Sequence, residues 1–343
     1  MPAPDAWLDA VRRHVDAQLD EFFAASRVEM LGLAPEAMPI VEAVEALTLR
    51  GGKRLRPAVL VAAFTSVSAS GDWRSTADAC AALELLQTYL LIHDDWMDGD
   101  EQRRGGPSVH AALRDRVGDA HLGASLAVLA GDLASAFSQR LMVRASTAAK
   151  SPVQALEAFV RMQTEVVCGQ SLDLLATTDV PRMQQLKTGS YTVAGPLRLG
   201  ALLAGATPEQ LGVLEAFGGP MGEAFQLRDD LLGTFGDPRT TGKPSGNDLR
   251  AGKRTALVLE AEQRLDADAR APLTRVLGLK EATDTQVAEA AALLVESGAK
   301  AGVERRLDML VQQAVGALDT PLLHETGRAM LQTLVEALAV RDR

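Results

Sequence analysis

The chain has 343 residues, 47% hydrophobic and 23% charged, which is enough material for a sizeable buried core. Its formal net charge of −10 argues against a nucleic-acid-binding protein that relies on a basic surface. The two cysteines, Cys80 and Cys168, lie far apart without metal-ligand spacing, which argues against a disulfide framework or zinc site and fits a reducing cytoplasm. The first residues lack the basic start and apolar core of a signal peptide, and the apolar runs are short or interrupted by Gly and Asp. We therefore expect a soluble, cytoplasmic protein without a transmembrane segment.

Helix-favouring residues dominate the whole chain, and the alternation of β-branched residues typical of strands is nearly absent. The pattern predicts helices at residues 5–23, 42–49, 57–67, 75–98, 122–147, 152–176, 183–204, 208–232 and 253–264, with three more between 284 and 340. The stretch 75–98 contains no Gly or Pro and is expected to be the longest uninterrupted helix. Residues 234–251 are rich in Gly, Pro, Asp and Thr, and a mobile lid is expected there. Without an internal repeat, residues 1–343 are predicted to form a single all-α domain.

A basic motif, Gly51-Gly52-Lys53-Arg54-Leu55-Arg56-Pro57, stands at a predicted junction between a loop and a helix. Its glycines expose backbone amides beside a helix N-terminus, and three cationic side chains accompany them. The motif therefore predicts an anion-binding site.

The helix 75–98 ends in an acidic cluster, His93-Asp94-Asp95-Trp96-Met97-Asp98. At about 100° per residue, Asp94 and Asp98 share one helix face, and Gln87 lies seven residues before Asp94 on that face. Mg²⁺ prefers carboxylate, water and phosphate oxygens to an all-protein cage, so two carboxylates on one face suit a Mg²⁺–diphosphate site. Arg103-Arg104, in a loop with glycines and proline, add guanidinium groups suited to phosphate. The alternative, a solvated acidic helix end, is electrostatically unfavourable at a C-terminus.

A second acidic motif, Gln226-Leu227-Arg228-Asp229-Asp230, lies in another predicted helix. It is followed by two segments with Gly-flanked lysines, Thr241-Gly242-Lys243-Pro244 and Gly252-Lys253-Arg254-Thr255. Paired aspartates followed by such lysines again indicate a site for a metal ion and a phosphate group.

Together these motifs and a Lys-Thr-x-x-Tyr string at 187–191 resemble the trans-isoprenyl diphosphate synthase (polyprenyl synthetase) family, which includes farnesyl and geranylgeranyl diphosphate synthases. The motifs span residues 48–255, and the length and helical content of the whole chain agree. The resemblance implies an all-α helical bundle around a central apolar cavity, the isoprenoid synthase fold. It also implies a homodimer that condenses isopentenyl diphosphate head to tail with allylic diphosphates.

The resemblance carries family roles onto matching positions of this chain. Isopentenyl diphosphate would be bound by Lys53, Arg56, Gln87 and Arg104. Asp94 and Asp98 would hold two Mg²⁺ ions and Asp229 a third. Arg103, Lys187 and Lys243 would contact the allylic diphosphate, with Lys253 closing over it, and Lys187, Thr188 and Gln226 would present dipoles to the developing allylic cation. Many bacterial relatives have His in place of Gln87, but Gln keeps a hydrogen-bond donor there.

One position departs from the family pattern, because the second acidic motif usually ends in a third Asp and Gly233 stands there instead. Asp229 is retained, so activity is expected with an altered metal affinity.

Product length is expected to depend on side chains below the first acidic motif. Tyr89 lies five residues before Asp94, about 7.5 Å along a helix, and Leu90 lies four before it. The aromatic residue at the fifth position, the non-aromatic residue at the fourth and the absence of a two-residue insertion between Asp94 and Asp98 together resemble the C20-forming pattern, so geranylgeranyl diphosphate is favoured over the C15 product. On an ideal helix, however, Leu90 faces the aspartate side better than Tyr89, so the floor of the tunnel is assigned to both positions.

Two other functions compete with this interpretation. A terpene cyclase also ionises prenyl diphosphates, but its usual second metal motif needs Ser or Thr and Glu where Asn247–Arg254 has Ala251 and Arg. A non-catalytic helical partner subunit of a prenyl synthase would be expected to lose one acidic motif, whereas this chain keeps both pairs.

Overall fold

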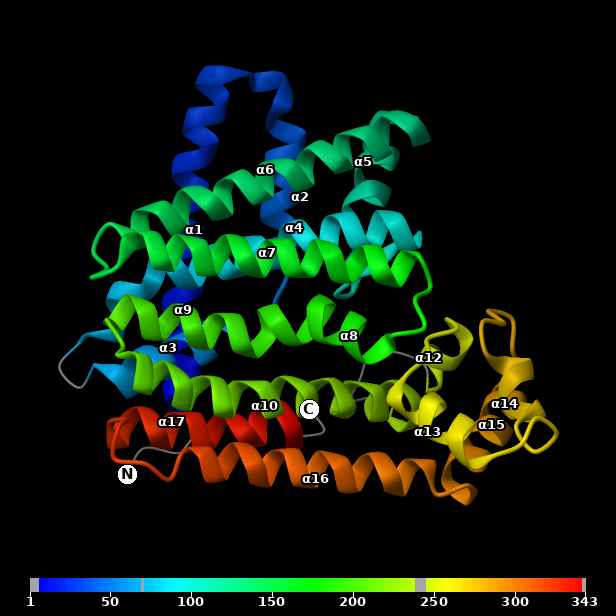
Figure 1. The fold of residues 1–343 in the computed structure, drawn as a ribbon. Helices are drawn as coiled ribbons and strands as arrows, with labels where there is room; N and C mark the ends of the chain where they lie inside the picture. Colours follow the sequence, from blue (N-terminus) through cyan, green and yellow to red (C-terminus); the bar gives the residue numbers. More distant parts are fainter. Residues whose placement is uncertain (1–5, 69–70, 238–244, 341–343) are drawn as a thin grey trace. The chain divides into compact units, whose positions relative to one another are not determined.

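The computed structural model describes residues 6–68, 71–237 and 245–340, which are almost entirely helical (Figure 1). The only strands within this part of the chain are β1 (Gln102–Arg103) and β2 (Gly106–Pro107), which pair antiparallel. The predicted all-α class is therefore confirmed.

The chain divides into two compact units, each assembled from segments that are not consecutive in sequence. Unit 1 consists of Met1–Thr164, Gly195–Leu211 and Leu322–Leu331, and unit 2 consists of Glu165–Ala194, Gly212–Pro321 and Gln332–Arg343. Three helices, α7, α10 and α17, contribute residues to both units.

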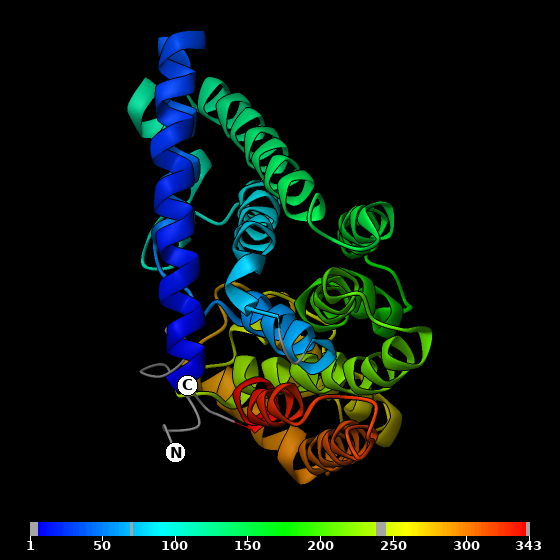
Figure 2. The same ribbon diagram turned by 90° about the vertical axis from the view of Figure 1, so that its left-hand side faces the viewer.

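Unit 1 contains the N-terminal helices. These are α1 (Ala6–Leu33), α2 (Met38–Leu49), α3 (Leu55–Val67), α4 (Ala77–Asp98), α5 (Val109–Val117), α6 (Ala120–Ser146), α9 (Gly195–Ala204), the first half of α7 (Pro152–Leu174) and most of α17 (Glu325–Val335), with 3₁₀ turns at Pro35–Ala37 and Trp73–Thr76. Figure 2 shows α1 as one long, nearly straight helix. At 28 residues it exceeds the 22 of α4, so the expectation that 75–98 forms the longest helix is wrong.

Helices α4 and α6 form the centre of unit 1 and pack closely on each other. Small residues allow this approach: a Cβ added at Gly131 of α6 would lie 2.2 Å from Nε2 of His93 on α4. The buried Ser138 hydroxyl of α6 donates a hydrogen bond of 2.7 Å to the carbonyl of Ala82. This packing fixes the helix that carries the first acidic motif.

Helix α3, which follows the basic motif, is buried around nearly its whole circumference. It packs against α9, where a Cβ added at Gly200 would lie 2.2 Å from the carbonyl oxygen of Leu60. A helix buried on all sides cannot shift without disturbing the core. The start of α3, at the basic motif, is therefore held firmly.

Unit 2 contains the second half of α7 and most of the C-terminal helices. These are α8 (Val180–Gln184), the π-helix η3 (Gln185–Ala194), α10 (Pro208–Phe235, from Gly212 onward), α12 (Asn247–Arg250), α13 (Ala256–Arg264), α14 (Ala271–Val276), α15 (Asp284–Glu296), α16 (Ala299–Ala317) and a π-helical turn, Glu336–Val340. Helix α15 begins with a capping box between Thr283 and Gln286.

The structure corrects several predicted boundaries. Residues 183–204 form three segments (the end of α8, η3 and α9) rather than one helix. Helix α13 begins at Ala256, so Lys253 and Arg254 lie in the turn before it and not within a helix. Helices α5 and α14 were not predicted. The centre of the expected lid, 238–244, lies outside the described residues, and its flanks form the end of α10 and the short helix α12.

Helix α6 is the one described helix that is long and apolar enough, by length and composition alone, to cross a membrane. The sequence expectation, based on interruptions by Gly and Asp, did not allow for it. Buried core helices of soluble proteins pass the same test, and the buried side of α6 packs against α4 and α5 in unit 1.

Candidate active site

The first acidic motif lies at the C-terminal end of α4, which stops at Gly99 in the left-handed conformation (φ 69°). Asp94 is half-buried and Asp98 is exposed one turn later. Among the described residues, no group of three or more His, Cys, Asp or Glu side chains could hold a metal ion by itself. The donor set fits Mg²⁺ that takes the rest of its shell from diphosphate and water, because Mg²⁺ is usually bound by one or two carboxylates in such sites.

The middle aspartate of this motif has a different role. Asp95 is fully buried and accepts a hydrogen bond of 2.7 Å from Nε of Arg103, whose guanidinium also contacts Asp100 at 3.2 Å. Arg103 lies on β1, opposite Gly106 of β2. Asp95 thus fixes the hairpin that follows α4, a contact that the sequence analysis did not foresee.

The hairpin and the basic motif are hydrogen-bonded to each other. Arg50, at the end of α2, donates to the carbonyls of Arg103 (3.1 Å) and Pro107 (2.8 Å). In return, Arg104 donates to the carbonyls of Gly51 (3.0 Å) and Leu47 (3.4 Å). The two segments that carry the predicted ligands of isopentenyl diphosphate therefore form one structure within unit 1.

Cationic groups converge there. The surrounding protein partly desolvates the exposed Lys53 side chain and lowers its pKa. Burial together with the neighbouring guanidinium groups of Arg54, Arg56 and Arg103 lowers the pKa of Arg104, although Glu84 opposes this. Cations that are partly desolvated beside other cations gain stability when an anion binds. Gln87 is half-buried on α4, in the same unit.

One member of the basic motif does not belong to the predicted anion site. The side chain of Arg54 is 3% exposed and is paired with Glu84 and Asp16. Of the three cations expected to face an anion, Lys53 is exposed and Arg56 is half-buried, so only Arg54 is sequestered.

The two chain-length candidates differ in their surroundings. The ring of Tyr89 lies edge-on to that of His93, with 5.0 Å between the centroids. His93 in turn lies 3.1 Å from the carbonyl of Val128 on α6. Tyr89 therefore faces the α4–α6 packing surface, whereas Leu90, also half-buried, lies one turn before Asp94.

The second acidic motif lies on α10 in unit 2, where Asp229 is exposed and Asp230 is buried. Asp230 accepts hydrogen bonds from Gln226 Nε2 (2.8 Å), the backbone N–H of Ala256 (2.9 Å) and Gln184 Nε2 (3.3 Å). Burial nevertheless raises the pKa of Asp230 to about 6. Asp230 therefore joins α10 to α8 and to the start of α13, while Asp229 is the accessible carboxylate.

Gly233, the departure from the family pattern, has a neighbour that explains it. A Cβ added at Gly233 would lie 1.9 Å from Oδ2 of Asp248, so the Asp248 carboxylate occupies the space that a side chain at 233 would need. Asp248 also lies 3.1 Å from Nζ of Lys253. Burial lowers the pKa of Lys253, but Asp248, Asp229 and Asp230 together raise it above its usual value.

Two further predicted site residues, Lys187 and Thr188, lie in η3. Nζ of Lys187 donates to Asp173 of α7 at 2.6 Å, and a Cβ added at Gly169 would lie 2.3 Å from the backbone nitrogen of Lys187. Thr188 is half-buried next to it. The predicted phosphate contact Lys243 lies outside the described residues.

A model of the family described as polyprenyl synthetase matches residues 38–294. The chain belongs to the polyprenyl synthetase family. It is 34% identical to a short chain isoprenyl diphosphate synthase of Methanocaldococcus jannaschii over 259 residues, and this match covers 73% of this chain and 75% of that protein. It is also 34% identical over 302 residues to a geranylfarnesyl diphosphate synthase of Aeropyrum pernix, with 85% and 91% covered.

Solved structures agree with this assignment. Geranylgeranyl pyrophosphate synthase from Corynebacterium glutamicum, complexed with isoprenyl diphosphate and magnesium, has a TM-score of 0.89 at 33% identity and covers 98% of this chain and 99% of its own. This polyprenyl synthetase therefore has the all-α isoprenoid synthase fold and is a Mg²⁺-using prenyltransferase that makes short-chain prenyl diphosphates.

Sequence reasoning missed two acidic residues of this synthetase, Glu84 and Asp248. Glu84 stands in the middle of an otherwise apolar stretch of α4, Leu83 to Leu86, and a lone charge there signals a buried partner. Asp248 carries no such signal, because its contact with Gly233 joins residues of different helices.

Proposed function

We propose that this polyprenyl synthetase condenses isopentenyl diphosphate head to tail with allylic diphosphates and releases mainly the C20 product, with C15 as a second product. One observation carries the proposal. Helix α4 bears Gln87, Asp94 and Asp98, and the hydrogen-bonded segments that bear the cations Lys53, Arg56 and Arg104 belong to the same unit. An acidic group for metal–diphosphate and a cationic group for a second diphosphate suit a reaction between two such substrates.

In this proposal Lys53, Arg56, Gln87 and Arg104 bind isopentenyl diphosphate. Asp94, Asp98 and Asp229 would hold Mg²⁺, in three ions, and bound Mg²⁺ would supply positive charge opposite the departing diphosphate. Arg103, Lys187, Lys243 and Lys253 add positive charge for the same leaving group. Gln226 and Thr188 orient dipoles toward the developing allylic cation.

A radiolabelled isopentenyl diphosphate incorporation assay tests the proposal, with C5, C10 and C15 allylic primers and with Mg²⁺ or EDTA. We expect incorporation that depends on Mg²⁺, and we expect Asp94→Asn and Asp229→Asn to reduce the rate by about a hundredfold or more, the loss typical of removing one electrostatic stabiliser. Asp308→Asn, an exposed acid on α16, makes the same charge change and should leave the rate unchanged. No incorporation by the wild-type protein would refute the proposal and would favour a terpene cyclase or a non-catalytic partner subunit.

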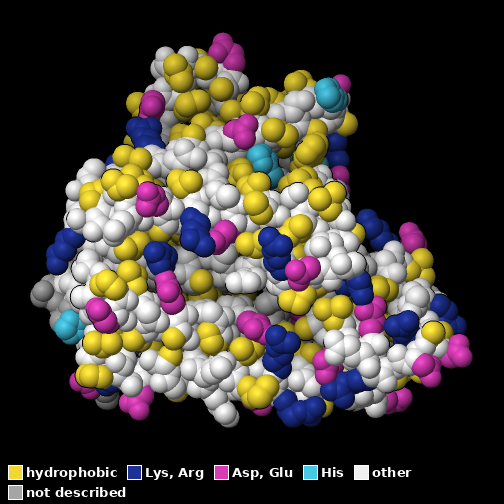
Figure 3. Space-filling model, viewed as in Figure 1, with side chains coloured by type: hydrophobic (Ala, Val, Ile, Leu, Met, Phe, Trp, Pro, Cys, Tyr) yellow, Lys and Arg dark blue, Asp and Glu magenta, His cyan; other side chains and the backbone are white. Residues whose placement is uncertain are grey.

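We further propose that the synthetase is a homodimer. Helix α6 exposes Leu122, Leu129 and Val143, and helix α7 exposes Val153, Val160, Val167 and Leu174. These side chains are 48% to 67% exposed and recur every seven residues. The one longer interval, from Leu129 to Val143, has Ala136 at the intermediate seventh position. Such a spacing gives an apolar stripe along one side of a helix, and Figure 3 shows hydrophobic side chains on the face where α6 and α7 lie in front. Exposed apolar stripes of this kind support an interface.

We propose a cytoplasmic location. Both cysteines are free, one buried and one exposed, which agrees with a reducing compartment.

A further inference from the structure

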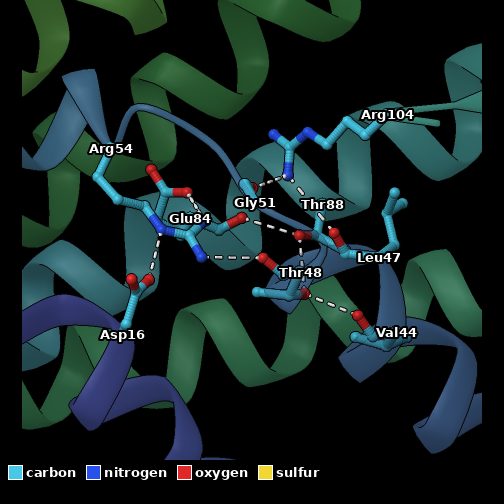
Figure 4. A network of polar contacts seen from close by, with 9 residues as sticks. All are labelled: Asp16, Val44, Leu47, Thr48, Gly51, Arg54, Glu84, Thr88 and Arg104. Carbon is cyan, nitrogen blue, oxygen red and sulfur yellow. Dashed lines mark hydrogen bonds and ion pairs between the residues drawn. The ribbon is translucent and has the colours of Figure 1, made fainter. Parts of the chain in front are cut away.

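Arg54 stands between two predicted diphosphate ligands, Lys53 and Arg56, yet its own guanidinium is buried and points toward Asp16 and Glu84 (Figure 4). Nε donates to Oδ1 of Asp16 at 2.8 Å, Nη1 to Oε2 of Glu84 at 2.5 Å and Nη2 to the carbonyl of Thr48 at 3.1 Å. All three nitrogens therefore have protein acceptors. A side chain that is 3% exposed and bonded in this way cannot also receive a diphosphate.

The three acceptors come from three different helices of unit 1: Asp16 from α1, Thr48 from α2 and Glu84 from α4. The Arg54 backbone is in the left-handed region (φ 50°), directly before the first residue of α3. Residues other than glycine rarely adopt this conformation, which persists where surrounding contacts impose it. The guanidinium contacts supply such a constraint here.

The glycine loop before Arg54 passes close to the Arg54 guanidinium. Gly51 and Gly52 have φ of 90° and 137°, and a Cβ added at Gly52 would lie 3.5 Å from Nη1 of Arg54 and 3.8 Å from the guanidinium of Arg104. The Thr48 hydroxyl lies 2.9 Å from that of Thr88, which donates to the Glu84 carbonyl at 3.0 Å. The end of α2, the glycine loop and α4 are thus connected through one polar network (Figure 4).

We propose that Arg54 is a positioning residue, which through Glu84 and Asp16 fixes the loop 50–54 so that Lys53 and Arg56 are directed at isopentenyl diphosphate. The inference rests on the proposed function, which assigns those two residues to that substrate. Buried ion pairs contribute little net stability, and their best-attested use is to select one arrangement over others. The arrangement selected here is that of the predicted binding loop.

The proposal predicts a specific kinetic signature. Arg54→Met and Glu84→Gln should each raise KM for isopentenyl diphosphate by about tenfold or more, the factor expected when one charge-assisted hydrogen bond to a phosphate is lost. KM for the allylic primer should stay within about twofold, because Asp94 and Asp98 lie about three to four turns further along α4. The double variant should be no worse than either single variant, since both remove the same ion pair.

Arg54→Lys separates positioning from direct binding. A single ammonium cannot reach three acceptors on three helices, so Lys should behave like Met if Arg54 positions the loop. A direct diphosphate ligand would be substantially rescued by Lys, and that result would overturn the proposal.

Leu19→Ala is the matched stability control, because Leu19 is fully buried on α1, the helix that supplies Asp16. It should lower the melting temperature without changing KM for isopentenyl diphosphate. The proposal is overturned if Leu19→Ala reproduces the KM change at an equal loss of melting temperature, or if Glu84→Gln, which removes the charge of the ion pair and keeps the side-chain shape, leaves KM unchanged. Since wild-type turnover is measured in the same assay, failure of the proposed function would be seen separately as no incorporation at all.

Discussion

Gly233 illustrates how a single residue can depart from a family pattern for a local reason. The space next to its Cα is filled by the carboxylate of Asp248, which is itself paired with Lys253. A negative charge is therefore present beside position 233, but it is supplied by a residue of α12 and not by α10. The expectation that the missing aspartate alters metal affinity remains a prediction.

Restoring the family residue should consequently be harmful. Gly233→Asp would drive its side chain into Asp248, and overpacking of this kind costs roughly 1–3 kcal/mol of stability. We expect a lower melting temperature, a weaker apparent affinity for Mg²⁺ and slower turnover. Thermal unfolding measures the first, and Mg²⁺ titration of the incorporation assay measures the other two.

Gly219→Asp is the control for this prediction, since it lies on the same helix and nothing stands within 4 Å of an added Cβ. The exchange variant Gly233→Asp/Asp248→Gly should recover stability relative to Gly233→Asp alone. If Gly233→Asp and Gly219→Asp are equally stable, the close approach of Asp248 does not destabilise the Gly233→Asp variant.

At the scale of the element, α4 determines where the chain-length residues face. Tyr89 lies against His93 at the α4–α6 packing surface, and Leu90 lies below Asp94. We expect Tyr89→Ala to lengthen the product, because loss of the ring opens space between two packed helices. Chromatography of the dephosphorylated products measures this, with Leu90→Ala as the companion variant. An unchanged distribution in Tyr89→Ala together with a longer product in Leu90→Ala would assign the floor to Leu90.

The helices show what sequence patterns can and cannot predict. The ends of α4 and α7 were predicted to within about two residues, because Gly99 and Pro152 are local stop and start signals. The split of residues 183–204 was missed, since a π-helix depends on neighbours such as Gly169 that lie elsewhere in the chain. Helix α1 continues ten residues beyond the predicted Phe23, through residues with adequate helix propensity but no distinct periodic end.

The residues of the candidate site likewise include some that local sequence patterns predict and some that they do not. Motif residues such as Asp94 and Asp229 were recognised from residue types at fixed local spacing, and the structure places them near helix ends on α4 and α10. The pairing of Arg54 with Glu84 joins residues 30 positions apart, and no local pattern encodes such a contact. Arg54 was consequently predicted to face an anion, although it faces the core.

At the scale of the whole molecule, the exposed stripes of α6 and α7 should govern association. Val160→Asp combined with Val167→Asp introduces two charges into the α7 stripe, and a desolvated charge without a partner is costly in an interface. We expect the wild-type protein to be a dimer and this variant a monomer, measured by sedimentation or light scattering. Met309→Asp, an exposed apolar residue on α16, is the control and should remain dimeric. A monomeric wild-type protein would contradict the prediction.

The arrangement along α4 also limits how this enzyme can change. Glu84, Gln87, Tyr89 and Asp94 are fixed in phase with one another by a single uninterrupted helix. One inserted or deleted residue would rotate everything beyond it by about 100° and shift it by about 1.5 Å, which would uncouple the loop anchor from the metal-binding end. Diversification of product size in descendants of this sequence should therefore proceed by exchange of side-chain volume at constant residue number between Glu84 and Asp94, and indels should accumulate outside that segment.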